Sequence, residues 1–294
     1  MRMKQKIGIF AQLSINRQQI VEQKKLNMKK YFSLLAMVFA VCLFTACSDD
    51  DDDKKVEEPV SALVGTWDVT ESTQTDEGSY QGAFKMTWDV PEGTALNIDM
   101  GFGQPIPMDI NEVITPLANS FANMYLPQVL KSVTFNADGT ITALYKELPD
   151  DALSTRATQN LGWKTANGYA TYKIVNDNLI TLYLNPNKMM EDADDEDKVL
   201  IQGVLTKFND GIPVNVRWDE TKTKAYFFVD KAFVQPILVS LNTILSNIPT
   251  SDMDDDDIAT LKLLKSVAEQ LPGIMDKTNT FEAGLELVKQ QTNA

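Results

Sequence analysis

Apolar and polar residues alternate along the middle of the chain, in short runs that turn residues separate. Phe84–Val90 alternates strictly, which is the pattern of a strand that buries one face. Asn136–Gly139 and Asn176–Asn178 have the composition of hairpin turns. About ten such strands joined by tight turns predict an antiparallel meander, closed or nearly closed into a barrel. We interpret as strands residues 63–69, 84–90, 96–100, 133–135, 140–145, 168–174, 179–184, 199–208, 212–218 and 225–229.

Helical spacing of apolar residues interrupts this meander in one place and follows it in others. Thr115–Pro116 suits the first positions of a helix, so we expect a helical insertion near 110–131. C-terminal helices are expected from residue 231 onward. The inserted helix has Leu117, Phe121 and Met124/Tyr125 on one face and is expected to end before Pro127. The apolar stripes of all these helices are interpreted as facing the core rather than a membrane or a partner. The ranges with helical character after 231 are 237–248, ended by Pro249, 258–271, ended by Pro272–Gly273, and a short last helix at 282–290.

The N-terminal part of the chain has a different pattern, which ends at Cys47. Basic Met28–Lys30 precedes the nearly unbroken apolar run Tyr31–Phe44, and small residues lead into Cys47. This order is typical of a secretory signal, and the run is shorter than the roughly 20 residues that span a bilayer. The ending resembles the lipobox of bacterial lipoproteins, which implies that Cys47 is acylated and becomes the first mature residue. An uncleaved anchor helix, or ordinary cleavage that leaves a free thiol, remains an alternative.

An acidic run follows the cysteine directly: Ser48, Asp49, Asp50, Asp51, Asp52 and Asp53. Blocks of like charge are typical of solvated, disordered linkers. The run also resembles the surface-export signal of Bacteroidetes lipoproteins, and the two interpretations are compatible. Together, these resemblances imply a protein of the outer membrane, held by acyl chains such as palmitate on Cys47 and facing the cell exterior.

These patterns divide the chain into four parts. Residues 1–27 are interpreted as an over-extended start, 28–46 as a lipoprotein signal peptide, 47–60 as a lipidated acidic linker, and 61–294 as one folded domain.

Composition narrows the range of functions. The formal net charge is −14, and leaving out the basic leader makes it more negative, so neither nucleic acid nor anionic lipid is an expected partner. The chain contains no histidine, and no GxGxxG, P-loop or CxxC motif. We therefore predict a protein that is not an enzyme and has no cofactor and no metal site. Carboxylate-based glycan hydrolysis stays formally open. Calcium at the acidic cluster 191–197 is a weaker interpretation than a solvated loop.

Aromatic residues supply the remaining candidate site. Trp67, Trp88, Trp163 and Trp218 can line a cavity for an apolar ligand, stack against sugars, or simply fill the core.

Gly65–Trp67 on the first strand, followed by a meander, resembles lipocalins and the wider calycin group, in particular the lipocalin-like lipoproteins of Bacteroidetes. The resemblance covers about 63–229 and implies that Trp67 closes the barrel floor as a structural residue. The chain departs from it by its inserted and C-terminal helices and by lacking disulfides. The expected fold is mainly β (α+β), a lipocalin-like β-barrel with these helices.

The resemblance also implies a cavity for a small apolar or amphipathic ligand. The alternative function is that of a non-catalytic accessory or structural protein at the cell surface, which contacts proteins or glycans.

Overall fold

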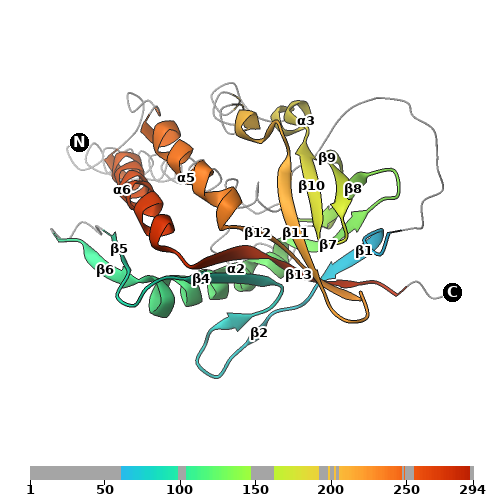
Figure 1. The fold of residues 1–294 in the computed structure, drawn as a ribbon, viewed down its shortest axis with the longest axis horizontal. Helices are drawn as coiled ribbons and strands as arrows, with labels where there is room; N and C mark the ends of the chain where they lie inside the picture. The colour runs from blue at the N-terminus through green and yellow to red at the C-terminus, as the bar shows by residue number, and fades with distance from the viewer. Residues whose placement is uncertain are drawn as a thin grey trace, which may run out of the picture.

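Eight antiparallel strands form a closed barrel in the computed structural model (Figure 1). The structure describes residues 61–98, 104–146, 162–191, 205–246 and 255–291, and the single positions 198, 202 and 248. Each barrel strand pairs with the next one along the chain, and the first pairs with the last, so the sheet closes on itself. The predicted fold class is therefore confirmed. The barrel strands are β1 (Gly65–Val69), β7 (Leu130–Phe135), β8 (Thr140–Tyr145), β9 (Lys164–Asn176), β10 (Leu179–Leu184), β11 (Ile212–Trp218), β12 (Lys224–Asp230) and β13 (Thr280–Lys289).

The two ends of this barrel differ in the length of their connections. Short turns at 136–139, 177–178 and 219–223 join strands at one end, which we call the turn end. The connections from β1 to β7, β8 to β9, β10 to β11 and β12 to β13 all leave from the other end, and all are longer. We call this the helix end, because the helices of the protein lie in these connections.

A long insertion separates β1 from β7 and extends the sheet beyond the barrel. Within it, β4 pairs with the first half of β13, from Thr280↔Asp89 to Leu285↔Phe84. The second half of the same edge pairs with β1, at 287–289. One edge of β13 is thus shared between two strands, and β4 continues the wall where β1 ends. The insertion contains β2 (Thr73–Gln74), β3 (Tyr80–Gln81), β4 (Phe84–Asp89), β5 (Ala95–Ile98), β6 (Ile106–Asp109), the π-helical turn η1 (Ile110–Ile114) and α2 (Thr115–Val129).

Two long helices connect β12 to β13. They are α5 (Lys231–Ser246) and α6 (Asp255–Lys277), which lie side by side at the helix end (Figure 1). Shorter helical turns, α3 (Pro186–Met190) and η3 (Thr206–Phe208), lie between β10 and β11. Within the described residues, no helix combines the length and the apolar character needed to cross a membrane.

Several local predictions were wrong. Residues 282–290 form most of β13 instead of a helix, because alternate residues such as Leu285 and Leu287 enter the core while the backbone pairs with β12. The expected strand 199–208 has helical backbone at 205–208. Neither Pro127 nor Pro272–Gly273 ends its helix, since α2 runs to Val129 and α6 to Lys277.

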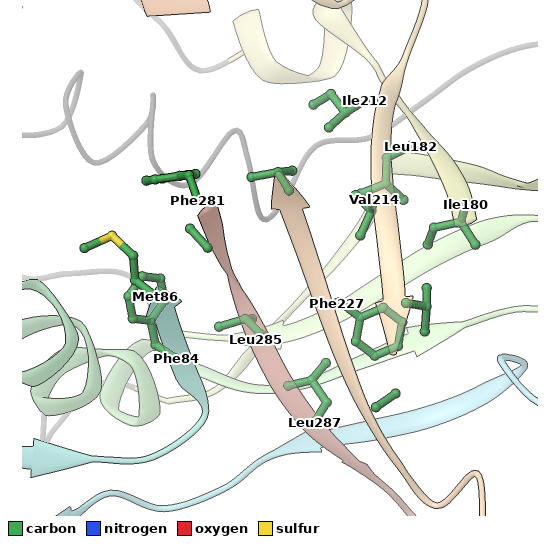
Figure 2. Close-up of a cluster of buried hydrophobic side chains, with 14 of the residues drawn as sticks. Phe84, Met86, Ile180, Leu182, Ile212, Val214, Phe227, Phe281, Leu285 and Leu287 are labelled. Carbon is green, nitrogen blue, oxygen red and sulfur yellow. The ribbon is translucent and has the colours of Figure 1, made fainter. Parts of the chain in front are cut away.

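One apolar core continues from the barrel interior into the β4–β13 extension. Figure 2 shows Phe84 and Met86 of β4 beside Leu285 of β13, with Val214 and Phe227 further along the barrel. The β12 and β13 backbones approach closely at Gly284, where a Cβ atom would lie 1.9 Å from the carbonyl oxygen of Phe227. A residue without a side chain is therefore required at this point of the wall.

Candidate functional site

Aromatic rings from five strands fill the turn end of the barrel. Trp67 is fully buried, and its ring centroid lies 5.7 Å from that of Trp218 and 5.6 Å from that of Phe227. Phe135 stacks on Phe227 at 5.4 Å and meets Tyr172 edge-on at 5.2 Å. These contacts reach across the interior, so side chains occupy the space inside this half of the barrel.

The polar atoms of these rings point toward the turn end. Trp67 Nε1 donates to the carbonyl of Leu63 at 2.8 Å, just before β1. Trp218 Nε1 donates to the carbonyl of Asp177 in the β9–β10 turn, at 2.6 Å. The Tyr172 hydroxyl donates to the carbonyl of Asn136 in the β7–β8 turn, at 2.7 Å. Each of these donors is thus satisfied by a backbone carbonyl, and the three bonds fix the rings as part of the barrel floor.

The Gly–x–Trp pattern has a local explanation in this floor. Lys289, near the end of β13, places its ammonium 5.5 Å from the centre of the Trp67 ring and donates to the carbonyl of Ala62 at 2.5 Å. Burial lowers the pKa of this ammonium. Gly65 has a φ of +132°, and a Cβ atom there would lie 2.9 Å from Lys289 Cε. Gly65 therefore makes room for the lysine that covers Trp67, in agreement with the structural role that the resemblance implied.

The other two tryptophans lie apart from this cluster. Trp88, on β4, is buried, donates from Nε1 to Thr278 Oγ1 at 2.9 Å and meets Phe281 edge-on. Trp163 is 38% exposed, and the Lys146 ammonium lies 4.7 Å from its ring centre. The structure thus brings Trp67 and Trp218 together and places Trp88 and Trp163 at separate locations.

The helix end of the barrel is lined by apolar side chains, with α5 above them. Ile212, at the start of β11, is fully buried, and Phe208 lies 5.9 Å from Phe233 of α5, centre to centre. The side chain of Asp230 accepts from the backbone N–H of Phe233 and so caps the first turn of α5. Lys231 Nζ donates to the carbonyl of Thr278, at the other end of the helical connection. These contacts hold α5 over the apolar interior.

An aromatic and charged cluster lies on the outer face of β11–β13. Tyr226 and Phe228 stack at 4.8 Å, and the Arg217 guanidinium lies 4.8 Å from the Phe228 ring centre. Arg217 also makes two hydrogen bonds to Glu282, at 2.7 and 3.1 Å, which raise the pKa of the arginine. The paired charges partner one another, so we assign this cluster a structural role.

Asparagine side chains of the insertion cover the free edge of β4. Asn123 accepts from the backbone N–H of Phe84 at 2.8 Å and donates to its carbonyl at 2.9 Å. Asn119 makes the same pair of bonds with Met86, at 2.7 and 2.8 Å. Asn111, in η1, accepts from and donates to Val90 in the same way. Asn119 and Asn123 are four residues apart on α2, a rise of about 6 Å, and their partners Met86 and Phe84 are two residues apart on β4, a rise of about 6.7 Å. The spacing of the amides along the helix therefore matches the spacing of the backbone groups along the strand.

Sequence reasoning missed this asparagine row and Lys289. Asn111, Asn119 and Asn123 are separated by multiples of four residues, which places them in one row along a helix, and this is the signal that could have been found. Cys47 and the acidic run 48–53 lie outside the described residues. In the part of the chain that the structure describes, no cluster of three or more histidine, cysteine or acidic side chains suits a metal ion.

The fold and this site define a class: a closed up-and-down barrel with a structural aromatic floor and a helix-covered opposite end. No protein-family model, no curated protein and no solved structure matches the chain.

Proposed function

We propose that this chain is a lipid-anchored, non-catalytic binding protein of the outer membrane, facing the cell exterior. Acyl chains on Cys47 hold it at the membrane, and its barrel takes up a small apolar or amphipathic molecule at the helix end. The asymmetry of the barrel is the observation that carries this proposal. Floor aromatics occupy one half, whereas every long connection leaves from the other half, where α5 covers an apolar interior.

The character of the interior selects the class of ligand. Ile212, Val229 and Leu285 bring aliphatic carbon to the helix half. Among the described residues, the buried polar side chains are Asn123, Ser132 and Thr278, and none of them is charged. A charged ligand placed there would lose its hydration without gaining a partner, which costs free energy. An apolar chain carries no charge that needs a partner, so its burial has no such cost. Ligand sites in barrels lie preferentially at the mouth.

Entry of a ligand at the helix end requires side chains to move. Phe233 and Leu238 of α5 pack against the core, so the ligand takes the place of such contacts and α5 shifts outward. Long connections are the parts of a fold that open most readily. A ligand polar group would then reach solvent at the rim.

Purification of the full protein from its own membranes, followed by mass spectrometry, tests both parts. Acylated Cys47 and a bound small molecule in a one-to-one ratio are the expected findings. Cys47→Ala should release the protein from the membrane fraction, and continued membrane association of this variant would refute the anchor.

Binding itself is tested with a fluorescent fatty-acid probe. Phe233→Ala enlarges the space beneath α5 and should raise probe affinity about tenfold, since the probe can fill the volume that the partly buried ring leaves. Val239→Ala is the matched control, because Val239 lies on the same helix and is 58% exposed. A folded protein that retains no small molecule, and binds the probe in neither form, would refute ligand binding and favour a surface accessory role.

A further inference from the structure

We propose that an exposed apolar ridge on α2 rests on the neutral lipid surface to which Cys47 tethers the protein. The ridge is formed by Val113 of η1 and by Leu117, Phe121 and Tyr125 of α2. This inference rests on the lipid anchor of the proposed function but is independent of any ligand in the barrel.

The ridge follows from a spacing of four residues. Val113, Leu117 and Phe121 are 38%, 56% and 45% exposed, and Tyr125 stacks against Phe121 with ring centres 4.8 Å apart. Residues four apart lie one above another on a helix, so these side chains form one continuous row. Large apolar side chains that gather on a surface in this way mark interaction sites, unlike single exposed ones.

The other faces of α2 are already engaged, and this fixes the direction in which the ridge points. Ala118 and Ala122 pack against the core, and Asn119 and Asn123 bond the edge of β4. The inner face of α2 thus combines apolar side chains, Leu126 among them, with the two amides, while the apolar side chains of the ridge are turned outward.

Charge distinguishes a neutral lipid surface from other occupants. The sequence of α2, TPLANSFANMYLPQV, contains no charged residue, although 23% of the chain is charged. A chain with a net charge of −14 repels a second copy of itself and an anionic surface. Zwitterionic lipid imposes no such penalty and accepts an uncharged apolar row.

The size of the ridge and the length of the tether agree with this occupant. Four partly exposed side chains offer on the order of 300 Å², well below the roughly 800 Å² per partner of a stable protein interface. A contact this small suffices only when a tether raises the effective concentration. The stretch from Cys47 to Ser61 spans at most about 50 Å, which keeps the domain within reach of the membrane.

Depth-dependent quenching tests the inference on the acylated protein in phosphatidylcholine vesicles. Cys47 is the only cysteine after Cys42 of the leader, so Phe121→Cys provides a single thiol for an environment-sensitive dye once Cys47 is acylated. Lipids with brominated chains should then quench about half of the emission, because the apolar face of an interfacial helix enters the acyl boundary by about 5–10 Å. Leu117→Cys should behave alike. Val239→Cys on α5 is the control and should lose no emission.

Each outcome has a distinct meaning. Protein that floats with the vesicles and is quenched at 121 but not at 239 supports the inference. Protein that floats without quenching at 121 overturns the inference and leaves the anchor intact. Protein that fails to float refutes the anchor, and the inference is refuted with it. A blue shift at 121 that grows with protein concentration in lipid-free detergent identifies a second copy as the occupant and also overturns it.

Discussion

Substitution of Asn123 by alanine tests whether α2 acts as a substitute strand along β4. Asn123 is 2% exposed, and its side chain satisfies both the N–H and the carbonyl of Phe84. Alanine would leave both backbone groups buried without partners, at about 1–3 kcal/mol each. We therefore expect a loss of about 2–6 kcal/mol in the free energy of unfolding, a large share of the 5–15 kcal/mol of a typical domain.

Urea unfolding followed by tryptophan fluorescence measures this loss, and hydrogen exchange of peptides covering β4 locates it. Asn97→Ala is the matched control, because Asn97 is exposed and bonded to Gln270; it should cost less than about 0.5 kcal/mol. Asn123→Asp retains an acceptor but loses the donor, so it should be destabilised at neutral pH and recover as the new carboxyl protonates. Equal midpoints for Asn123→Ala and Asn97→Ala would show that the amide row contributes no stability.

Three further predictions follow from the barrel itself. Gly284→Ala forces a Cβ atom against the carbonyl of Phe227 and should cost about 3 kcal/mol, seen as a lower melting temperature than that of Gly162→Ala, where nothing lies within 4 Å of the added atom. Burial and the nearby charge of Asp138 raise the pKa of Tyr172 from 10.0 to about 12. The folded state therefore favours the neutral phenol, so the contribution of Tyr172 to the free energy of unfolding is complete below pH 10 and is lost as the pH rises toward 12. Urea midpoints between pH 9 and 12 should therefore fall less steeply for Tyr172→Phe, and parallel curves would contradict this. Trp67→Phe leaves the carbonyl of Leu63 without its donor and should lower the free energy of unfolding by about 1–3 kcal/mol. An unchanged free energy of unfolding would show that water replaces the indole N–H and would contradict this prediction.

Local pattern predicted much of the barrel, because its strands alternate and its turns carry turn residues. Residues 140–145, 179–184 and 212–218 are strands with the predicted bounds. Residues 282–290 were misassigned because Glu, Leu and Lys there favour a helix locally, whereas pairing with β12 and β4 decides the outcome. Such pairing joins segments far apart in the sequence, and no local window contains it.

The candidate site was predictable only in part. Trp67 is marked by Gly65, but nothing near it in the sequence indicates Lys289, which arrives from the far end of the chain. Trp88 and Trp163 are similar to Trp67 in residue type alone. The insertion that carries β4 places Trp88 apart from the floor, and Trp163 lies just before β9. The outward row on α2 was interpreted as core-facing, because a helical stripe does not reveal that asparagines take the inner positions.

The shared edge of β13 has a consequence for the time course of biogenesis. As the chain emerges from a ribosome or a translocation pore, β1 and β4 appear long before β13, the strand to which both pair. Until β13 arrives, neither the cylinder nor its extension can be completed, because both lack the same partner. The polypeptide therefore cannot close its barrel until almost all of it has been made, which suits the export that we propose for this chain.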